Sequence, residues 1–292
     1  MVLCCLKNMI KAFANAKLNL NLHLLPLKKE GLFPVHYINC ELDLHDALWF
    51  EFQPETIEVV CDFPGVPENG ENLVYKAAQL LKDYAQTPNG VKIRIEKQIP
   101  VRVGLGGGSS DAATALKVLV KMWNIKIDQK ILIRLARQVG TDVCYSLIGG
   151  VALVEADGTK IKRLRVSRPE LFVLILVPRE EKPSTEWSFK QLSSDILGRH
   201  IAKADNLLNA LKKKEVDLFF SSLHNDFEEP LNRHFPVINK MKGDLLEHGA
   251  GATNLCGAGL AMAGFYTDKK VAAFAQQRLK RKYKQTVMGR IL

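Results

Sequence analysis

The sequence lacks the features of a membrane or secreted protein. No apolar run approaches the about 20 residues that a membrane-spanning helix requires. The first ten residues carry one lysine and two adjacent cysteines, without the long apolar stretch of a secretory signal. We therefore expect a cytoplasmic protein that has no membrane partner.

Cysteine is scarce and scattered. The 292 residues include six cysteines, with no C-x-x-C pair and no spacing typical of a metal site. We expect reduced thiols rather than disulfides, and the sequence predicts no metal-ligating residue. Internal repeats are also absent.

Positive charge is in excess, with a formal net charge of +10. Such an excess suits nucleic acid, a membrane surface or a phosphorylated small molecule as the partner. Short basic clusters occur at residues 212–214 and 278–284, and both are typical of solvated helix faces. We therefore expect a small-molecule substrate and no nucleic acid.

Apolar residues make up 47% of the chain, enough for one large core or two smaller ones. Their spacing predicts helices at residues 72–84, 110–123, 131–139, 203–211, 216–223, 237–248 and 270–282. It predicts strands at residues 16–25, 37–44, 47–52, 91–95, 151–155 and 172–177. Because strands and helices mix without regular β-α-β alternation, we expect an α+β fold of two domains, residues 1–152 and 153–292.

The most informative segment is the glycine-rich run between Pro100 and Asp111, which joins a predicted strand to a predicted helix. Glycines let the backbone approach an anion closely, and successive N–H groups at a helix start can hold phosphate oxygens. Two serines that follow, Ser109 and Ser110, can cap the helix or donate to phosphate. The run lacks the Gly-Lys-Ser/Thr of a Walker A loop. A simple tight turn is the alternative interpretation.

This run resembles the phosphate-binding motif of the GHMP kinases, which include galactokinase, homoserine kinase and mevalonate kinase. Further segments resemble that family in the same order, from about Ala12 to Tyr266. They are Ala16–Leu20 in the opening strand, Glu71–Leu73 on the adenine side, Gly140–Val143 around an aspartate and Gly257–Gly259 in a third motif. Within the family, the likeness is greatest to the branch whose acceptor is a diphosphocytidyl-linked methylerythritol.

The resemblance implies an active site in the cleft between two domains and an ATP-dependent transfer to an alcohol. Mg²⁺ is expected from the chemistry of ATP alone. The resemblance also implies that Asp142 is the general base and that Lys17 offsets negative charge beside it. The implied ATP-binding residues are Pro100, Gly104, Leu105, Gly106, Gly107, Gly108, Ser109, Ser110 and Asn72. The implied acceptor-binding residues are Asn19, Thr185 and Phe189, where the aromatic ring can stack on a base or simply fill the core.

Three positions depart from the family pattern. Phe33 stands where the cytidyl kinases carry a base-binding histidine, and His36 lies three residues further on. Ala258 replaces a serine or threonine in the third motif, and Cys144 replaces a proline after the aspartate motif. The alternatives are a GHMP kinase for another small alcohol, such as homoserine or mevalonate, and a nucleotide-binding pseudokinase. The predicted assembly is a monomer or a homodimer.

Overall fold

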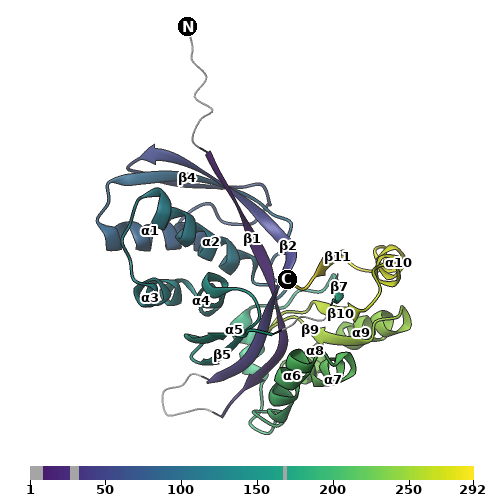
Figure 1. Ribbon diagram of the computed structural model, residues 1–292. Coiled ribbons are helices and arrows are strands. Elements are labelled where there is room, and N and C mark those ends of the chain that lie inside the picture. The colour runs from purple at the N-terminus through teal and green to yellow at the C-terminus, as the bar shows by residue number, and fades with distance from the viewer. Residues whose placement is uncertain (1–8, 27–32, 167–169) are drawn as a thin grey trace. The chain divides into compact units, whose positions relative to one another are not determined.

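The computed structural model describes residues 9–26, 33–166 and 170–292 (Figure 1). Contacts divide the described residues into two units. The first contains residues up to 16, 45–99 and 106–148, and the second contains 17–44, 100–105 and 149–292. The division into domains after residue 152 stays a prediction.

Two long strands, β1 (Met9–Leu24) and β2 (Val35–Pro54), each contribute residues to both units. The sequence predicted two separate strands within the second of these segments, and that prediction is wrong. The first part of β2 pairs with β5 (Ala152–Ala156), whereas its last part pairs with β4 (Asn89–Glu96). Each part has its own antiparallel partner, so the strand continues through Asp43 and His45 without a turn.

In the first unit, β3 (Ile57–Cys61) extends the sheet by pairing in parallel with β4. Its helices are α1 (Leu73–Ala85), α2 (Gly107–Met122), α3 (Gln129–Val139) and α4 (Thr141–Ile148). Helix α2 packs against both α1 and α4, and the short apolar side chains of its first turns are buried. The start of α2, the end of the glycine-rich run, is thereby fixed in place.

The second unit contains an antiparallel sheet in the order β11-β7-β10-β9. Its strands are β7 (Phe172–Val177), β9 (Ala252–Leu255), β10 (Met262–Tyr266) and β11 (Gln285–Arg290). The continuous apolar run of β7 is buried at the centre, as expected for a strand covered on both faces. The Gly/Ala-rich segment after residue 249 was not predicted to form strands, yet it supplies β9 and β10.

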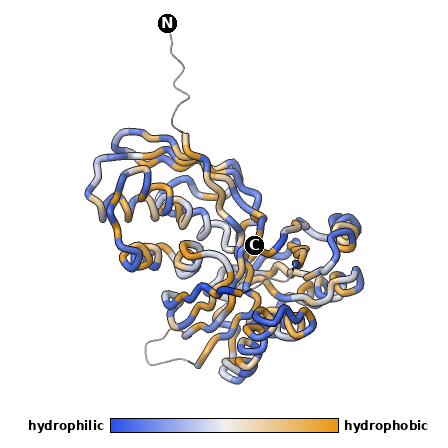
Figure 2. Tube along the Cα trace, in the orientation of Figure 1, coloured by the Kyte–Doolittle hydropathy of each residue, from blue (hydrophilic) through white to orange (hydrophobic). Residues whose placement is uncertain are grey.

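Smaller elements complete the second unit. They are β6 (Lys160–Arg163), α5 (Thr185–Lys190), α6 (Ala202–Lys213), α7 (Val216–Ser222), β8 (His224–Asn225), α8 (Glu228–His234), α9 (Val237–Glu247) and α10 (Lys269–Leu279). Hydrophobic and hydrophilic residues alternate along the helices, which is typical of helices with one buried face (Figure 2). No helix in the described part of the chain is long and apolar enough to cross a membrane.

Candidate active site

The glycine-rich run is held by backbone-to-backbone packing in the second unit. Gly104 has φ +97, and a Cβ built on it would lie 1.8 Å from the carbonyl oxygen of Cys256. A Cβ on Gly259 would lie 2.1 Å from the carbonyl oxygen of Val103. No side chain fits at either glycine, so the glycine-rich run and the third motif are in direct contact.

The run ends at the start of α2. Gly106, in the left-handed region, is the N-cap residue, and no side chain caps the helix. The first N–H groups of a helix have no partner inside it, and they carry the positive end of the helix dipole. Gly108 is exposed, and a Cβ on it would meet only Leu73 Cδ1, at 3.6 Å. The geometry is that of an anion site beside the start of α1.

Asn72 lies at that same start, as the N-cap of α1. Its side-chain oxygen accepts from Val74 N at 2.8 Å, and its amide donates to the carbonyl of Pro67. The described interactions of Asn72 are therefore those of a cap, and its contact with ATP stays a prediction.

A buried ion cluster that the sequence did not reveal supports the run from inside the first unit. Lys97 Nζ contacts Asp46 Oδ2 at 2.5 Å and Asp111 Oδ2 at 2.7 Å, and all three side chains are nearly inaccessible. The other oxygen of Asp46 accepts from the backbone N–H groups of Gln98 and Ile99. Only the tertiary structure brings these three charges together, because nothing in their spacing marks them.

The cluster changes the proton affinity of its members. Burial raises the pKa of Asp111 to about 7; the Lys97 ammonium opposes the rise and the Asp46 carboxylate adds to it. Burial alone would lower the pKa of Lys97, but the two carboxylates outweigh it and raise that pKa. Lys97 is therefore a stable cation, and Asp111 takes up a proton near neutral pH.

In the second unit, Lys17 begins a line of buried polar side chains. Its Nζ donates to Asn19 Oδ1 at 2.8 Å, and Asn19 Nδ2 donates to Asn39 Oδ1 at 2.6 Å. Within the described residues, Nδ2 of Asn39 has no hydrogen-bond partner. The sequence did not point to Asn39, which stands on β2 and faces the predicted site residues of β1.

The backbone of Lys17 joins this line to the two glycine motifs. Its N–H donates to the carbonyl of Leu105 at 2.9 Å. A Cβ built on Gly257 would lie 3.3 Å from Lys17 Nζ. The structure thus brings Lys17, Asn19, Leu105 and the third motif together; that they form one active site stays a prediction.

Asp142 is the second residue of α4, half-buried in its first turn. A carboxylate at this position is favoured by the positive end of the helix. Cys144, at the family's proline position, is buried with its sulfur 3.6 Å from the carbonyl of Ile133. Asp142 belongs to the first unit and Lys17 to the second, and the role of each stays a prediction.

An aromatic cluster lies in the second unit. The rings of Phe33 and Phe189 stack with centroids 6.2 Å apart and planes 22° apart, and Phe227 meets Phe189 edge-on at 5.0 Å. Phe189 is only half-buried, while Thr185, one turn earlier on α5, is exposed. His36 instead lies beside Glu155, with Nδ1 3.7 Å from Oε1.

Comparison with known proteins identifies the family. The model of the GHMP kinases N terminal domain matches residues 72–152, and that of the GHMP kinases C terminal domain matches residues 207–285. The chain therefore belongs to the GHMP kinase family. The expected family and the expected two-domain α+β fold are both confirmed.

The relatives and solved structures cover nearly the whole chain. A 4-diphosphocytidyl-2-C-methyl-D-erythritol kinase of Clostridium botulinum is 31% identical over 97% of this chain and 99% of its own. One of Thermodesulfovibrio yellowstonii is 35% identical over 89% and 91%. A crystal structure of 4-(cytidine 5'-diphospho)-2C-methyl-D-erythritol kinase superposes with a TM-score of 0.80 at 28% identity, over 97% and 99%. A homoserine kinase of Cytophaga hutchinsonii, 18% identical with a TM-score of 0.78 over 100% and 97%, shares the fold.

The ion cluster generates a prediction about stability. The pKa of Asp111 is raised from 3.8 in the unfolded chain, so the folded state binds this proton more tightly and loses stability as pH rises through 7. Asp111→Asn cannot titrate. We expect the parent to lose on the order of 2 to 4 kcal/mol of unfolding free energy relative to this variant between pH 4 and pH 8, at about 1.4 kcal/mol per pKa unit.

The measurement is urea unfolding of both proteins at several pH values. Asp205→Asn, an exposed change on α6, serves as the control and should follow the parent at every pH. A difference between Asp111→Asn and the parent that stays constant with pH would show that Asp111 is ionised throughout.

Proposed function

We propose that this GHMP kinase transfers the γ-phosphoryl group of ATP to a hydroxyl of 4-diphosphocytidyl-2-C-methyl-D-erythritol. The observation that carries the proposal is the phosphate loop, which ends at the uncapped start of α2 and is anchored to Lys17 and to the third glycine motif. Relatives of that name match almost the whole chain, which supports the choice of acceptor.

In the proposed reaction, ATP phosphates lie against the N–H groups of the loop and of the first turn of α2. Asp142 accepts the proton of the acceptor hydroxyl as its oxygen bonds to the γ-phosphorus. The bond from the γ-phosphorus to the bridging oxygen breaks, and ADP leaves. Lys17 provides an ammonium that offsets charge on the phosphoryl group in transit, which is where most of the catalysis of phosphoryl transfer arises.

Mg²⁺ fits the donors available at the loop. Ser109 and Ser110 offer hydroxyl oxygens at the start of α2, the hard oxygen ligands that Mg²⁺ prefers alongside phosphate. The ion would neutralise charge on the β- and γ-phosphates when bound.

The Phe33–Phe189 pair supports a cytidyl acceptor. A planar base between two rings needs about 7 Å, twice a carbon contact distance of about 3.5 Å. The ring centroids are 6.2 Å apart, so the pair has to open to admit a base, and Phe189 is only half-buried. We infer that stacking binds the base here, with Phe33 in the position of the family's histidine.

The same Phe33 favours the second candidate, a kinase for another small alcohol. An apolar ring cannot donate or accept hydrogen bonds at the polar edge of a base, and a site that loses such a partner loses discrimination. Turnover of purified protein with ATP, Mg²⁺ and a panel comprising the cytidyl substrate, homoserine and mevalonate separates the two candidates. Absence of turnover on all three would support the pseudokinase alternative.

The loop is tested at Gly108, whose missing side chain leaves the approach to the helix start open. We expect Gly108→Ala to lower ATP affinity by about 10-fold or more because its Cβ crowds the phosphates, while thermal stability is kept or raised, since alanine favours helix. Gly243→Ala is the matched control, because this glycine lies inside α9 with no atom within 4 Å of its Cβ position.

Calorimetric titration of ATP gives the affinities. Gly107 is a poorer choice, because a Cβ there would press on Ile99 at 3.1 Å and on Lys97 at 3.2 Å and disturb the ion cluster. Unchanged ATP affinity in a folded Gly108→Ala variant would mean that the loop is structural only.

The catalytic pair is tested by removing its charges. We expect Asp142→Asn to keep ATP affinity near the parent value and to lower kcat by ~10²-fold or more, because asparagine cannot accept the proton. Lys17→Met should also lower kcat, and the two losses should be less than additive if both residues serve one step.

Steady-state kinetics with the cytidyl substrate measure these effects, with Asp83→Asn on α1 as the control at an exposed carboxylate. Nearly full turnover in Asp142→Asn would exclude Asp142 as the base.

The acceptor site is tested at Phe189. Loss of one aromatic stacking partner costs about 1–3 kcal/mol per base, so Phe189→Ala should raise KM for the cytidyl substrate by about 5- to 150-fold and leave KM for ATP unchanged. Phe274→Ala, at a ring on α10 that is 56% exposed, should change neither constant. An unchanged KM in Phe189→Ala, or an equal effect on ATP, would exclude stacking of the base on this ring.

A further inference from the structure

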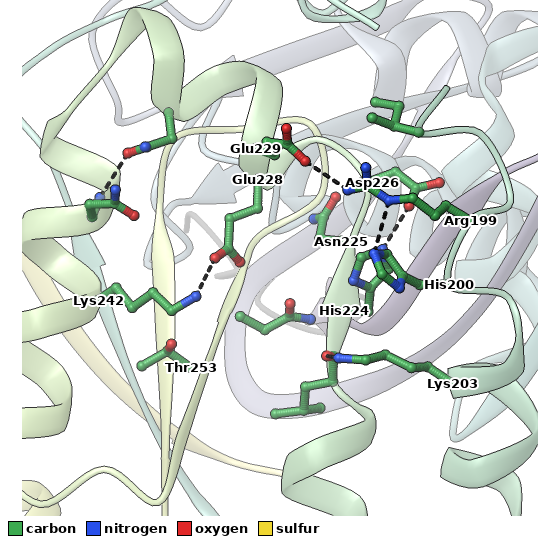
Figure 3. Close-up of a pocket in the computed structure, with 15 residues that line it drawn as sticks. Arg199, His200, Lys203, His224, Asn225, Asp226, Glu228, Glu229, Lys242 and Thr253 are labelled. Atoms are coloured by element: carbon green, nitrogen blue, oxygen red, sulfur yellow. Dashed lines mark hydrogen bonds and ion pairs between the residues drawn. The ribbon is translucent and has the colours of Figure 1, made fainter. Parts of the chain in front are cut away.

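A pocket of about 370 Å³ opens in the second unit, among residues of α6, β8, α8, α9 and β9 (Figure 3). None of its lining residues belongs to the predicted ATP or acceptor site. Most of its cations are paired: Arg199 with Glu229, and Lys242 with Glu228. In one wall stand His224 and Asp226, joined by a hydrogen bond of 2.7 Å between Nε2 and Oδ1.

A third side chain, His23, approaches them from β1. Strands β1 and β8 pair in parallel, with Asn21 opposite His224. The rings of His23 and His224 consequently stack, with centroids 5.0 Å apart and planes 18° apart. One ligand atom from each of His23, His224 and Asp226 lies within 4.8 Å of the other two.

Asp226 is held in a fixed orientation. Its Oδ2 accepts from the N–H of Leu24 at 2.7 Å, and its own backbone N–H donates to the carbonyl of Leu22. The remaining oxygen, Oδ1, is directed at the histidines, 2.7 Å from His224 Nε2 and 4.0 Å from His23 Nδ1. Backbone support of this kind is what orients a carboxylate ligand in metal sites.

The burial of His23 is not explained by an ordinary hydrogen-bond network. Its side chain is fully buried, yet among the described residues neither ring nitrogen has a hydrogen-bond partner. Burying two unpaired polar atoms costs free energy, and such atoms are rare in folded proteins.

We propose that His23, His224 and Asp226 form a binding site for a divalent transition metal, with Zn²⁺ as the occupant. Two imidazoles and one carboxylate are a common three-ligand set for Zn²⁺, and they leave the fourth position to water. His224, whose side chain is 18% exposed to the pocket, provides the route of entry and room for that water.

The distances require a modest closure of the three ligands. Zn²⁺ binds nitrogen and oxygen at about 2.0–2.2 Å, so two ligand atoms in a tetrahedral site lie about 3.4 Å apart. The three ligand atoms now lie within 4.8 Å of one another. The widest distance between two of them therefore has to shorten by at most about 1.4 Å. The His224 ring can rotate on its exposed side, and its 2.7 Å contact with Asp226 opens so that the ion takes the place of the proton between them. The 4.0 Å between His23 Nδ1 and Asp226 Oδ1 shortens by about 0.6 Å.

Such an ion would fasten β8, a strand of two residues, to β1. It would not replace the Mg²⁺ of the kinase reaction, because Mg²⁺ prefers six oxygen ligands and binds imidazole weakly. The site is therefore independent of the proposed function, and its test does not depend on turnover.

The experiment measures Zn²⁺ binding to the full chain by equilibrium dialysis at pH 7.5, with and without millimolar Mg²⁺. We expect one saturable Zn²⁺ per chain that excess Mg²⁺ does not displace, together with a raised Tm. His224→Gln and Asp226→Asn should each weaken binding by about 10-fold or more, since even outer-shell changes cost 10- to 100-fold. His234→Gln, at an exposed histidine of α8, is the matched control and should bind as the parent does.

Replacing Zn²⁺ with Co²⁺ shows which atoms hold the ion. Absorption typical of nitrogen and oxygen ligands supports the site, whereas a thiolate-to-cobalt charge-transfer band would assign the ion to cysteines and overturn the proposal. It is also overturned if the parent shows no saturable binding, or if His224→Gln, folded by circular dichroism, binds with the parent's affinity. In that case His224 and Asp226 form only a structural hydrogen bond.

Discussion

The contact of Gly104 with Cys256 and of Gly259 with Val103 is the constraint on which the candidate site depends. Two loops, more than 150 residues apart in the chain, touch through their backbones, where any side chain would collide. Because the phosphate loop cannot move away from the third motif, Leu105 stays within reach of the Lys17 N–H. Main-chain contacts therefore fix the relative positions of the glycine-rich run, the third motif and the Lys17 backbone.

Buried polar groups then fix the positions that the glycines leave open. Lys97 holds Asp46 and Asp111 behind the start of α2, and Lys17 begins the line through Asn19 to Asn39. Burying ions gains little stability and often costs some, whereas losing one partner of a buried pair is strongly destabilising. We therefore interpret these networks as contacts that restrict the loop to one arrangement, and not as a main source of stability.

The proposed acceptor recognition rests on different physics from the proposed phosphate binding. The proposed phosphate loop would use main-chain N–H groups, whose hydrogen bonds any nucleoside triphosphate can accept, whereas the proposed acceptor site would use the aromatic faces of Phe33 and Phe189, which suit a planar base. The family relationship establishes the kinase class. The apolar residue at position 33 is the feature of this chain that bears most directly on which acceptor it prefers.

The sequence by itself determined the family and most of the regular elements, and it singled out the glycine-rich run. The reason is that glycine runs, helix periodicity and continuous apolar strands are local signals: the prediction of β7 at residues 172–177 is confirmed to the residue. Lys17, Asn19 and the glycine motifs could be named from their local patterns. By contrast, the ion cluster of Asp46, Lys97 and Asp111, and the triad of His23, His224 and Asp226, could not be predicted. Their members are single polar residues from distant segments, and only strand pairing and helix packing in the tertiary structure bring them close together.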